Sequence, residues 1–514
     1  MFRLSGKLLG ALTGIAAAAV IAAMLPAGQV SAAGTGSEVE DNDSIFKANT
    51  IVEDTEYSAS FSSKDDVDYF KFTLPKSGRV AFTGTFDTSH YYAVYDSSEK
   101  VLYTYSISSD SGERRLTCDL TAGTYYLRLK SVYYTGNYSF HFAYTPANET
   151  YEESGNGTNN TYSTSNPIAL GTTYTGQLAK NDMMDYYKFT ISAVGTMILN
   201  TSSDYSASYY IYDVNEKQLY NSSTYDKEHK FSYVLTPGTY YLEVKTTNRT
   251  GVYSFSYQFN NAAITGASAS VVCGNQLDLD IINAAGLKVA WSTNNTRIAT
   301  VNDYGYVRGL KAGPVTVVAT VGGQTLTYNV QVLYKDVSNP KEYWFLPTNY
   351  LTNQDVVKGY DGQTTFKPGN NCTRAQMVTF LWRLKGSPKP TSSSTKFKDV
   401  KKSAYYYKAV LWAVEKGITT GYSKTKFKPN NVCTRAQTVT FLWRMANKPK
   451  AGNTKNKFKD INKTDYFYDA VLWASGKGIV EGYKNGTFRP QNKCTRRQMV
   501  TFLYKYDKFV NGKG

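Results

Sequence analysis

Histidine is scarce in this sequence, with 3 residues in 514, and cysteine is nearly as rare, with 5. So few imidazoles leave little material for zinc sites or for histidine-based catalysis. His90, His141 and His229 do not occupy matching places in the repeats described below, and no nucleophile elbow, zinc helix motif or phosphate loop is present. The composition predicts a protein that is not an enzyme.

The cysteines do not form the pattern of a disulfide framework. Their number is odd, and Cys372, Cys433 and Cys494 occupy the same place in three successive units of the chain. Three equivalent positions cannot all pair among themselves. We expect them to be small buried hydrophobic residues beside a helix start.

Only one long apolar run occurs, and it stands at the start of the chain. Arg3 and Lys7 precede a run from Leu8 to Leu25, and small residues follow it near Ala32. The pattern favours a signal peptide over residues 1–32, and a membrane anchor is the weaker alternative because no stop-transfer charge follows. We expect a secreted protein that leaves the membrane after cleavage.

The charge is divided between the two halves of the chain. Residues 335–514 hold 34 basic and 11 acidic side chains, a net charge of +23, whereas residues 34–334 have a net charge of −9. In a secreted protein such a basic end faces wall polymers or other extracellular polyanions, and nucleic acid is not the expected partner.

The basic third repeats with a period of 61 residues. Each unit holds a Cys-Thr-Arg motif beginning at Cys372, Cys433 or Cys494, with a Gln two residues after the Arg and Val-Thr-Phe-Leu soon afterwards. An apolar stripe earlier in the second and third units predicts another helix, ended by Gly417 and Gly478. In the first unit Pro347 replaces this stripe, and we expect it to break the helix and leave that unit's groove a structural role only.

The arginine of the repeated motif lies in the first turn of the predicted second helix. Thr434 is a good N-cap and Gln437 completes a capping box, but a cation there opposes the helix dipole. One interpretation is that the guanidinium and the free backbone N–H groups form a fork for a carboxylate or phosphate. The other, equally weighted, pairs the arginine with the aspartate that opens a neighbouring unit.

These three units resemble S-layer homology repeats. The resemblance implies a three-pronged bundle whose grooves bind an anionic secondary cell wall polymer, often through a pyruvylated sugar. It implies that Arg374, Arg435 and Arg496 contact the sugar, that Asp336, Asp399 and Asp460 shape the grooves, and that Trp412 and Trp473 line them. The family's Glu is Gln here, which makes the grooves more basic.

The acidic half contains a second duplication. The segment from Asp68 to Thr73 recurs from Asp185 to Thr190, an offset of 117 residues, within short Tyr-rich alternating runs typical of antiparallel sandwiches. These segments resemble the bacterial pre-peptidase C-terminal family, a jelly-roll-like module with relatives that bind collagen or polysaccharide. The resemblance implies an extracellular polysaccharide or a collagen-like protein as the outward partner.

Calcium is the one cofactor that this resemblance suggests. Oxygen ligands gather in the first copy at Glu40, Asn42, Ser44, Asp65, Asp66 and Asp68. The second copy offers Asn159, Asn160, Asp182 and Asp185, so with fewer carboxylates its site should be weaker or absent. The alternative, slightly favoured, is a solvated acidic loop.

The region between the halves resembles a bacterial Ig-like domain of group 2, with Trp291 as a core residue and the role of a spacer. We therefore expect a multidomain chain: an all-β N-terminal part with two jelly-roll-like sandwiches and one Ig-like sandwich, then a mainly α bundle of three repeats. The expected boundaries are 1–32 for the signal peptide, 33–147 and 148–260 for the sandwiches, 261–334 for the Ig-like domain, and 335–514 for the repeats (335–390, 396–449 and 457–509).

Together these features predict a non-catalytic protein on the surface of a Gram-positive-type bacterium. The repeats anchor it to the wall polymer, and the β modules bind extracellular glycan or matrix protein. The alternatives are an accessory module for a secreted peptidase and a structural protein of the S-layer.

Overall fold

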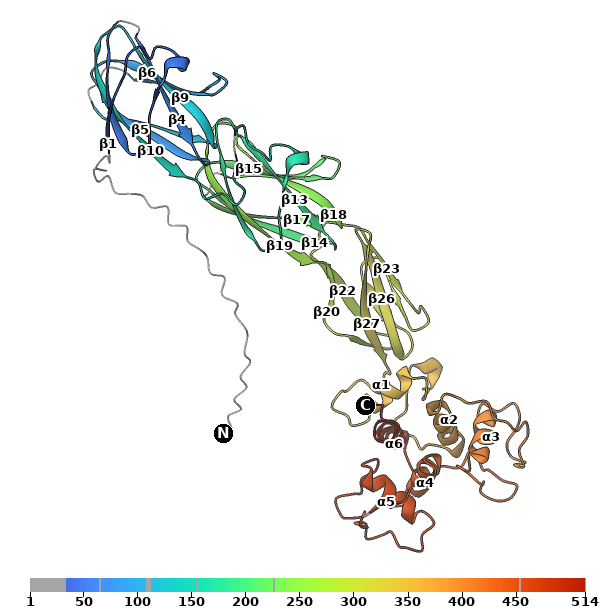
Figure 1. The fold of residues 1–514 in the computed structure, drawn as a ribbon. Coiled ribbons are helices and arrows are strands. Elements are labelled where there is room, and N and C mark those ends of the chain that lie inside the picture. The colour runs from blue at the N-terminus through green and yellow to red at the C-terminus, as the bar shows by residue number, and fades with distance from the viewer. Residues whose placement is uncertain are drawn as a thin grey trace, which may run out of the picture. The chain divides into compact units, whose positions relative to one another are not determined.

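The computed structural model describes residues 34–63, 66–107, 112–153, 155–224, 227–452 and 454–513 (Figure 1). The predicted signal peptide and Asp65 lie outside the described residues. Strands fill the chain up to Leu333, and the α-helices begin at Phe345. The predicted fold class, all-β followed by a mainly helical region, is confirmed.

The first sandwich pairs two five-stranded sheets, with strand orders β1-β3-β10-β5-β8 and β2-β4-β9-β6-β7. In β4 the side chains of Phe70 and Phe72 are buried, whereas Tyr69 and Lys71, which alternate with them, face outward, because successive side chains of a strand point to opposite faces. The strands are β1 (Gly34–Ser37), β2 (Asn49–Thr50), β3 (Thr55–Phe61), β4 (Val67–Leu74), β5 (Gly78–Phe86), β6 (His90–Asp96), β7 (Val101–Ile107), β8 (Arg114–Leu120), β9 (Gly123–Ser131) and β10 (Gly136–Pro146).

The second sandwich repeats the strand order of the first. Its sheets are β11-β13-β18-β15-β16 and β12-β19-β14-β17, which correspond strand for strand to the first sandwich apart from β1. Short 3-10 helices, Ile45–Lys47 and Tyr162–Thr164, precede β2 and β11. The strands are β11 (Asn166–Pro167), β12 (Thr173–Leu178), β13 (Met184–Ile191), β14 (Gly195–Ser203), β15 (Ala207–Asp213), β16 (Gln218–Thr224), β17 (Glu228–Leu235), β18 (Gly238–Lys245) and β19 (Gly251–Asn261).

The Ig-like region has two four-stranded sheets, β20-β22-β25-β24 and β21-β27-β26-β23. Trp291 is partly buried and packs against the core, as a core role predicts. The strands are β20 (Ala263–Gly266), β21 (Ser270–Val272), β22 (Gln276–Ile282), β23 (Val289–Thr293), β24 (Ala299–Val301), β25 (Tyr306–Gly309), β26 (Gly313–Val321) and β27 (Gln324–Leu333).

The helical region consists of three successive helix pairs. Gly417 and Gly478, with φ of 64° and 70°, follow the first helices of the second and third pairs, as predicted. None of the helices in the described part of the chain is long and apolar enough to span a bilayer. The pairs are α1 (Phe345–Asn353) with α2 (Arg374–Leu384), α3 (Tyr407–Glu415) with α4 (Arg435–Met445), and α5 (Tyr468–Gly476) with α6 (Arg496–Phe509).

The first unit keeps its helix despite Pro347, so the predicted break is wrong. Helices α1, α3 and α5 each have nine residues, and Pro347 is the third residue of α1. The first turn of a helix has N–H groups without an intrahelical acceptor, so a proline there removes no hydrogen bond. The first unit is therefore complete in its backbone.

The three cysteines close the helical region into a ring. The amide of Cys433 donates to the carbonyl of Cys372 at 2.9 Å, Cys494 donates to Cys433 at 2.8 Å, and Cys372 donates to Cys494 at 2.9 Å. All three thiols are buried and unpaired, as predicted, and burial raises the pKa of Cys494 to about 11. They pack as inert hydrophobic groups around a three-fold pseudo-axis.

Candidate polymer-binding grooves and cation sites

Each second helix of a pair begins with the predicted capping box. Thr373, Thr434 and Thr495 are the N-caps, and the Gln three residues later returns a hydrogen bond to each. The arginine at the next position is buried in all three units: Arg374, Arg435 and Arg496 are 4%, 3% and 1% exposed. Burial lowers the pKa of each guanidinium.

The buried arginines bind the backbone of the next unit. The Nε of Arg374 donates to the Phe427 carbonyl at 2.9 Å, and Arg435 donates to Phe488 at the same distance. Arg496 of the third unit returns to Phe366 of the first at 2.8 Å. The guanidinium groups therefore hold the three units together as a closed cycle.

The backbone N–H groups at these helix starts are occupied. The amide of Arg435 donates to the Asn492 carbonyl at 2.9 Å, and the amide of Ala436 donates to Pro490 at 3.0 Å, with equivalent bonds in the other two units. The expectation of free N–H groups for an anion is therefore wrong, because the loop of the next unit uses them.

The repeated aspartates hold the same loop from its other side. Asp399 accepts hydrogen bonds from the amides of Phe427 and Lys428 at 2.9 and 2.8 Å, and Asp336 and Asp460 do the same in their units. Arginine and aspartate thus meet through one peptide group: Arg374 donates to the carbonyl of Phe427, and Asp399 accepts from the amide of Lys428. This arrangement differs from the direct ion pair that sequence reasoning considered.

The pinned loop forces a basic residue into the left-handed region. Lys367, Lys428 and Arg489 have φ of 58°, 57° and 60°, although each precedes a proline. Such a conformation costs about 1 kcal/mol or more for a residue with a Cβ and is retained where the surroundings impose it. The backbone therefore has the same conformation at Lys367, Lys428 and Arg489.

Each of these cations lies over a tyrosine of its own loop. Lys367 is 5.0 Å from the centre of the Tyr360 ring, Lys428 is 3.6 Å from Tyr422, and Arg489 is 4.0 Å from Tyr483. We call these three pairs the cation–tyrosine plates: Lys367/Tyr360, Lys428/Tyr422 and Arg489/Tyr483.

A buried guanidinium lies close to two of the plates. Arg435 is 5.1 Å from the Tyr483 ring and Arg496 is 4.8 Å from Tyr360. A cation near an aromatic face is worth about 0.5–2 kcal/mol, depending on how far it is desolvated. In these two plates the tyrosine ring therefore lies near a buried guanidinium as well as near the surface cation.

A second set of tyrosines completes the grooves. Tyr343, Tyr405 and Tyr466 directly precede the residues that cap α1, α3 and α5, and they are 55%, 62% and 62% exposed. Partial burial raises the pKa of Tyr343, against the opposing charges of Arg497 and Arg435, and Tyr483 also lies near this hydroxyl. The surroundings of Tyr343 therefore include side chains from the second and third units.

Sequence reasoning named other residues for these grooves. Trp412 and Trp473 lie in the core, 4% and 3% exposed, and the three arginines lie beneath the surface. The plates were missed, although the repeated Phe-Lys-Pro and Gly-Tyr segments were visible in the sequence. A basic residue that recurs just before a proline was the available signal.

Carboxylates converge at the start of β4 in the first sandwich, where Asp66 and Asp68 are buried and their neighbours are partly or fully exposed. Oxygens of Glu38, Glu40 and Asp68 lie within 4.8 Å of one another, as do those of Asp43, Asp66 and Asp68. One oxygen each of Asn42 and Asp68 is buried without a hydrogen-bond partner in the described part of the chain. Burial raises the pKa of Asp68 to about 9, so in the absence of a cation this carboxyl keeps its proton.

Of the predicted ligands, Glu40, Asn42, Asp66 and Asp68 thus lie at or beside this cluster. Ser44 precedes the 3-10 helix Ile45–Lys47 and makes no capping hydrogen bond through its side chain. Glu38 was missed because it lies further upstream in the chain. Several hard oxygen donors with unused lone pairs fit calcium.

The second sandwich has an equivalent and more deeply buried cluster. Oxygens of Glu153, Asp182 and Asp185 lie within 4.8 Å of one another, and all three residues are buried. Each carboxyl has an oxygen without a partner among the described residues, as does Asn159. Gly157, with φ of 87°, leaves room here, since a Cβ on it would lie 2.3 Å from Asp182. Sequence reasoning missed Glu153, which supplies the third carboxylate.

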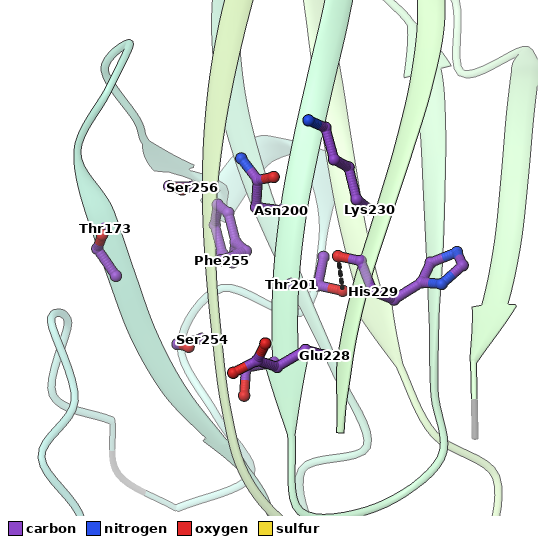
Figure 2. Close-up of a pocket in the computed structure, with 10 residues that line it drawn as sticks. Thr173, Asn200, Thr201, Glu228, His229, Lys230, Ser254, Phe255 and Ser256 are labelled. Atoms are coloured by element: carbon purple, nitrogen blue, oxygen red, sulfur yellow. Dashed lines mark hydrogen bonds between the residues drawn. The ribbon is translucent and has the colours of Figure 1, made fainter. Parts of the chain in front are cut away.

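A shallow depression on the β12-β19-β14-β17 sheet has no reactive pair (Figure 2). Its lining includes Ser254, Ser256, Glu228 and Lys230. Figure 2 shows the imidazole of His229 pointing away from Glu228 and Lys230, and His229 lies 3.3 Å from Ser222. The imidazole of His229 therefore does not face the two serines, and the lining of the depression is mostly polar, with Phe255 among it.

Three family models match the chain. The S-layer homology domain matches residues 334–378, 396–439 and 457–500, the bacterial pre-peptidase C-terminal domain matches residues 66–131, and the bacterial Ig-like domain (group 2) matches residues 258–341. The chain therefore carries three S-layer homology repeats, a pre-peptidase C-terminal domain and a group 2 Ig-like domain. The second sandwich lies outside the matched residues 66–131, but it has the same strand order as the first sandwich.

Similar proteins include both anchoring proteins and enzymes. The chain is 32% identical over 154 residues to a cellulosome-anchoring protein of Acetivibrio thermocellus, 33% over 175 to an endoglucanase of a Bacillus species, and 30% over 131 to an S-layer protein of Bacillus thuringiensis. These matches cover 29%, 32% and 25% of this chain but only 34%, 18% and 16% of those proteins. The chain is a secreted, cell-wall-anchored surface protein of a Gram-positive-type bacterium.

Proposed function

We propose that this protein is a non-catalytic surface protein whose three repeats grip an anionic secondary cell wall polymer. Its β modules then bind an extracellular glycan or a matrix protein. The observation that carries the proposal is the recurrence of the cation–tyrosine plates in a region with a net charge of +23. The similarity to an anchoring protein supports it.

In this proposal the plates and the outer tyrosines touch the polymer. The exposed rings of Tyr343, Tyr405 and Tyr466 offer flat faces to sugar rings, and Lys367, Lys428 and Arg489 meet the negative groups. The buried arginines act as positioning residues, because they fix the loops that carry the plates. Asp336, Asp399 and Asp460 share this positioning role.

The test removes the plate charges and leaves the core intact. Full-length protein with Lys367→Gln, Lys428→Gln and Arg489→Gln is mixed with isolated walls, and the bound fraction is measured by co-sedimentation. We expect retention to weaken by about tenfold at moderate salt, because each lost contact is worth about 0.5 kcal/mol. Unchanged retention would contradict the proposal.

A matched control loses the same charge elsewhere in the helical region. Lys402, Lys416 and Lys477 are exposed and lie outside the plates, so their replacement by Gln should leave retention within about twofold of the parent. If both triple variants lose retention equally, binding follows bulk charge and not the grooves. Walls treated with acid to remove pyruvate then identify which anionic group is recognised.

We also propose that each sandwich holds a calcium ion at its cluster of buried carboxylates. The unpartnered oxygens of Asp68 and Asp185 support this assignment, because buried polar groups normally have partners. Glu38, Glu40 and Asn42 would act with Asp68, and Glu153, Asn159 and Asp182 with Asp185. The ion would neutralise carboxylates that burial otherwise keeps protonated.

A further inference from the structure

The outer face of the β2-β4-β9-β6-β7 sheet combines tyrosines with cations. The inward side chains of its strands, such as Phe70, Phe72 and Leu127, are fully buried. The alternate positions of β4, β6 and β9 therefore face outward, and none of them is Asp or Glu. We call this surface the basic sheet face and define it by Tyr69, Lys71, Tyr91, Tyr126, Arg128 and Lys130.

Cross-strand pairing places rings and cations side by side on this face. Tyr69 pairs with Arg128 and Lys71 pairs with Tyr126 between β4 and β9. Lys130 pairs with Tyr91 between β9 and β6. Directly opposed residues have Cβ atoms about 5 Å apart, so each of these three pairs places a ring beside a cation.

The three cations of the face lack partners of their own. Within the described residues, Lys71, Arg128 and Lys130 form no ion pair and no side-chain hydrogen bond. The Nε of Arg128 is buried and unpartnered, and its guanidinium lies 5.3 Å from the centre of the Tyr95 ring. Three unpaired cations gather here in a half of the chain that is acidic overall.

The corresponding face of the second sandwich carries a central acid whose charge is met by neighbouring side chains. Glu243 stands where the first sandwich has Arg128, and it accepts hydrogen bonds from Tyr186 at 3.0 Å and Tyr212 at 2.7 Å. Lys245 lies 3.6 Å from it. The Tyr162 ring, from the 3-10 helix before β11, packs 4.6 Å from Tyr186.

The difference between the two copies is specific. Both copies keep both lysines, since Lys188 and Lys245 correspond to Lys71 and Lys130, and they keep Tyr69 and Tyr126 as Tyr186 and Tyr241, whereas Tyr91 is replaced by Ser208. The central position differs: it is Glu243 in the second sandwich and Arg128, which forms no ion pair among the described residues, in the first. Ile45 occupies the place of Tyr162 there, so no ring covers the face. The first face therefore offers unmet charge to a ligand, and the second does not.

We propose that the basic sheet face binds an anionic polysaccharide, such as a polymer of uronic acids. Carboxylates of the ligand would pair with Lys71, Arg128 and Lys130, and sugar rings would lie on the tyrosines between them. A flat sheet with alternating rings and charges suits an extended chain of rings better than a globular acidic protein. This inference rests on the proposed function only in assigning ligand binding to the β modules.

The test must measure each lysine separately, because a polyanion is also expected to bind the basic helical region. Full-length protein is treated with an amine-acetylating reagent, with and without polygalacturonate, and the rate at each lysine is read by mass spectrometry. We expect Lys71 and Lys130 to react about fivefold more slowly with polygalacturonate present. Lys188 and Lys245, their counterparts in the second sandwich, should keep their rates.

Comparison with other ligands shows which chemical class the face recognises. Neutral dextran should protect neither pair of lysines. If Lys71 and Lys130 react equally with and without polygalacturonate, the inference is overturned. Stronger protection by single-stranded DNA than by polygalacturonate also overturns it. Protection by neutral dextran or collagen alone overturns the anionic ligand but leaves the proposed function standing.

A variant links protection to the central cation. Arg128→Glu copies the second sandwich, where neighbouring tyrosines satisfy the acid, so the sheet should fold and the protection of Lys71 and Lys130 should vanish. Arg128→Gln serves as a second variant and should reduce protection at least twofold. Retention on walls, measured in parallel, should not change in either variant, which separates this inference from the anchoring proposal.

Discussion

The acidic β modules and the basic helical region treat buried charge in opposite ways. In the helical region, Arg435 and Arg496 are buried, but each donates two hydrogen bonds to backbone carbonyls. In the sandwiches, Asp68 and Asp185 are buried with oxygens that find no partner among the described residues. The helical region satisfies its buried charges within the chain, whereas in the sandwiches these carboxylate oxygens are left for the calcium ions proposed above.

The largest effect on stability should come from removing a buried arginine whose hydrogen bonds are all made within the chain. Arg435→Ala leaves the carbonyls of Phe488 and Glu481 without their donor and opens a cavity, so we expect a loss of about 3 kcal/mol or more in the stability of the helical region. Thermal unfolding followed by the helix signal in circular dichroism measures it. Arg497→Ala, at a half-buried neighbouring position, should cost less than about 1 kcal/mol. Equal losses in the two variants would contradict the comparison.

Calcium should have the next largest effect, confined to the sandwiches. A ligand at 100 times its dissociation constant stabilises the folded state by about 2.7 kcal/mol, so the β transition should rise in temperature with calcium and fall with a chelator. Asp185→Asn with Asp182→Asn should abolish the part due to the second sandwich. Asp213→Asn, at a turn outside the cluster, is the matched control. A calcium effect that survives the double variant argues against the second site.

The pH dependence of stability should become flatter with calcium. Without a cation, folded Asp68 keeps its proton between the ordinary value of 3.8 and about 9, whereas the unfolded chain has lost it. Unfolding then releases a proton, so stability falls as the pH rises through that window. Bound calcium requires ionised carboxylates, so its stabilisation grows with pH. When unfolded at several pH values, chelator-treated protein should lose stability as the pH rises, whereas calcium-loaded protein should show almost no slope, and parallel slopes would exclude a carboxylate site.

The smallest effect on stability should come from the plates. Lys428→Asn keeps a residue that tolerates the left-handed conformation, so the unfolding transition should move by less than about 0.5 kcal/mol. Calorimetry measures the shift, with Lys428→Val as the contrast, because a β-branched residue is strained at this φ. A large loss in the Asn variant would show that the lysine supports the fold and not a ligand.

The sequence predicted the repeats well because their signals are local. The Thr–Gln capping boxes, the ends at Gly417 and Gly478, and the buried cysteines follow from propensity and spacing alone. The prediction at Pro347 was wrong because a proline is tolerated in the first turn of a helix but not in its interior. The start of this helix could not be located from the sequence, since no capping side chain marks it. The burial of Arg374 was hidden because its acceptor, Phe427, lies 53 residues away.

The site residues were harder to predict for the same reason. A plate needs a tyrosine, a pinned loop and a left-handed lysine, and the pinning comes from an aspartate 29 residues earlier and an arginine of another unit. Glu153 meets Asp182 and Asp185 only in the folded chain, because it lies about 30 residues before them in the sequence. Alternation in β4 and β9 did indicate which side chains share a face, but only the register shows that Tyr69 stands beside Arg128.

The closed cycle of arginines also limits how this anchor can evolve. In an open stack of repeats, a unit can be gained or lost at an end, because each contacts only its neighbours. Here the third guanidinium returns to the first unit, and the three cysteine amides form a ring. A fourth copy would have no place in that circle, and two would leave donors and acceptors stranded. Tandem duplication therefore cannot strengthen attachment by small steps, and greater avidity must come from a second complete trio.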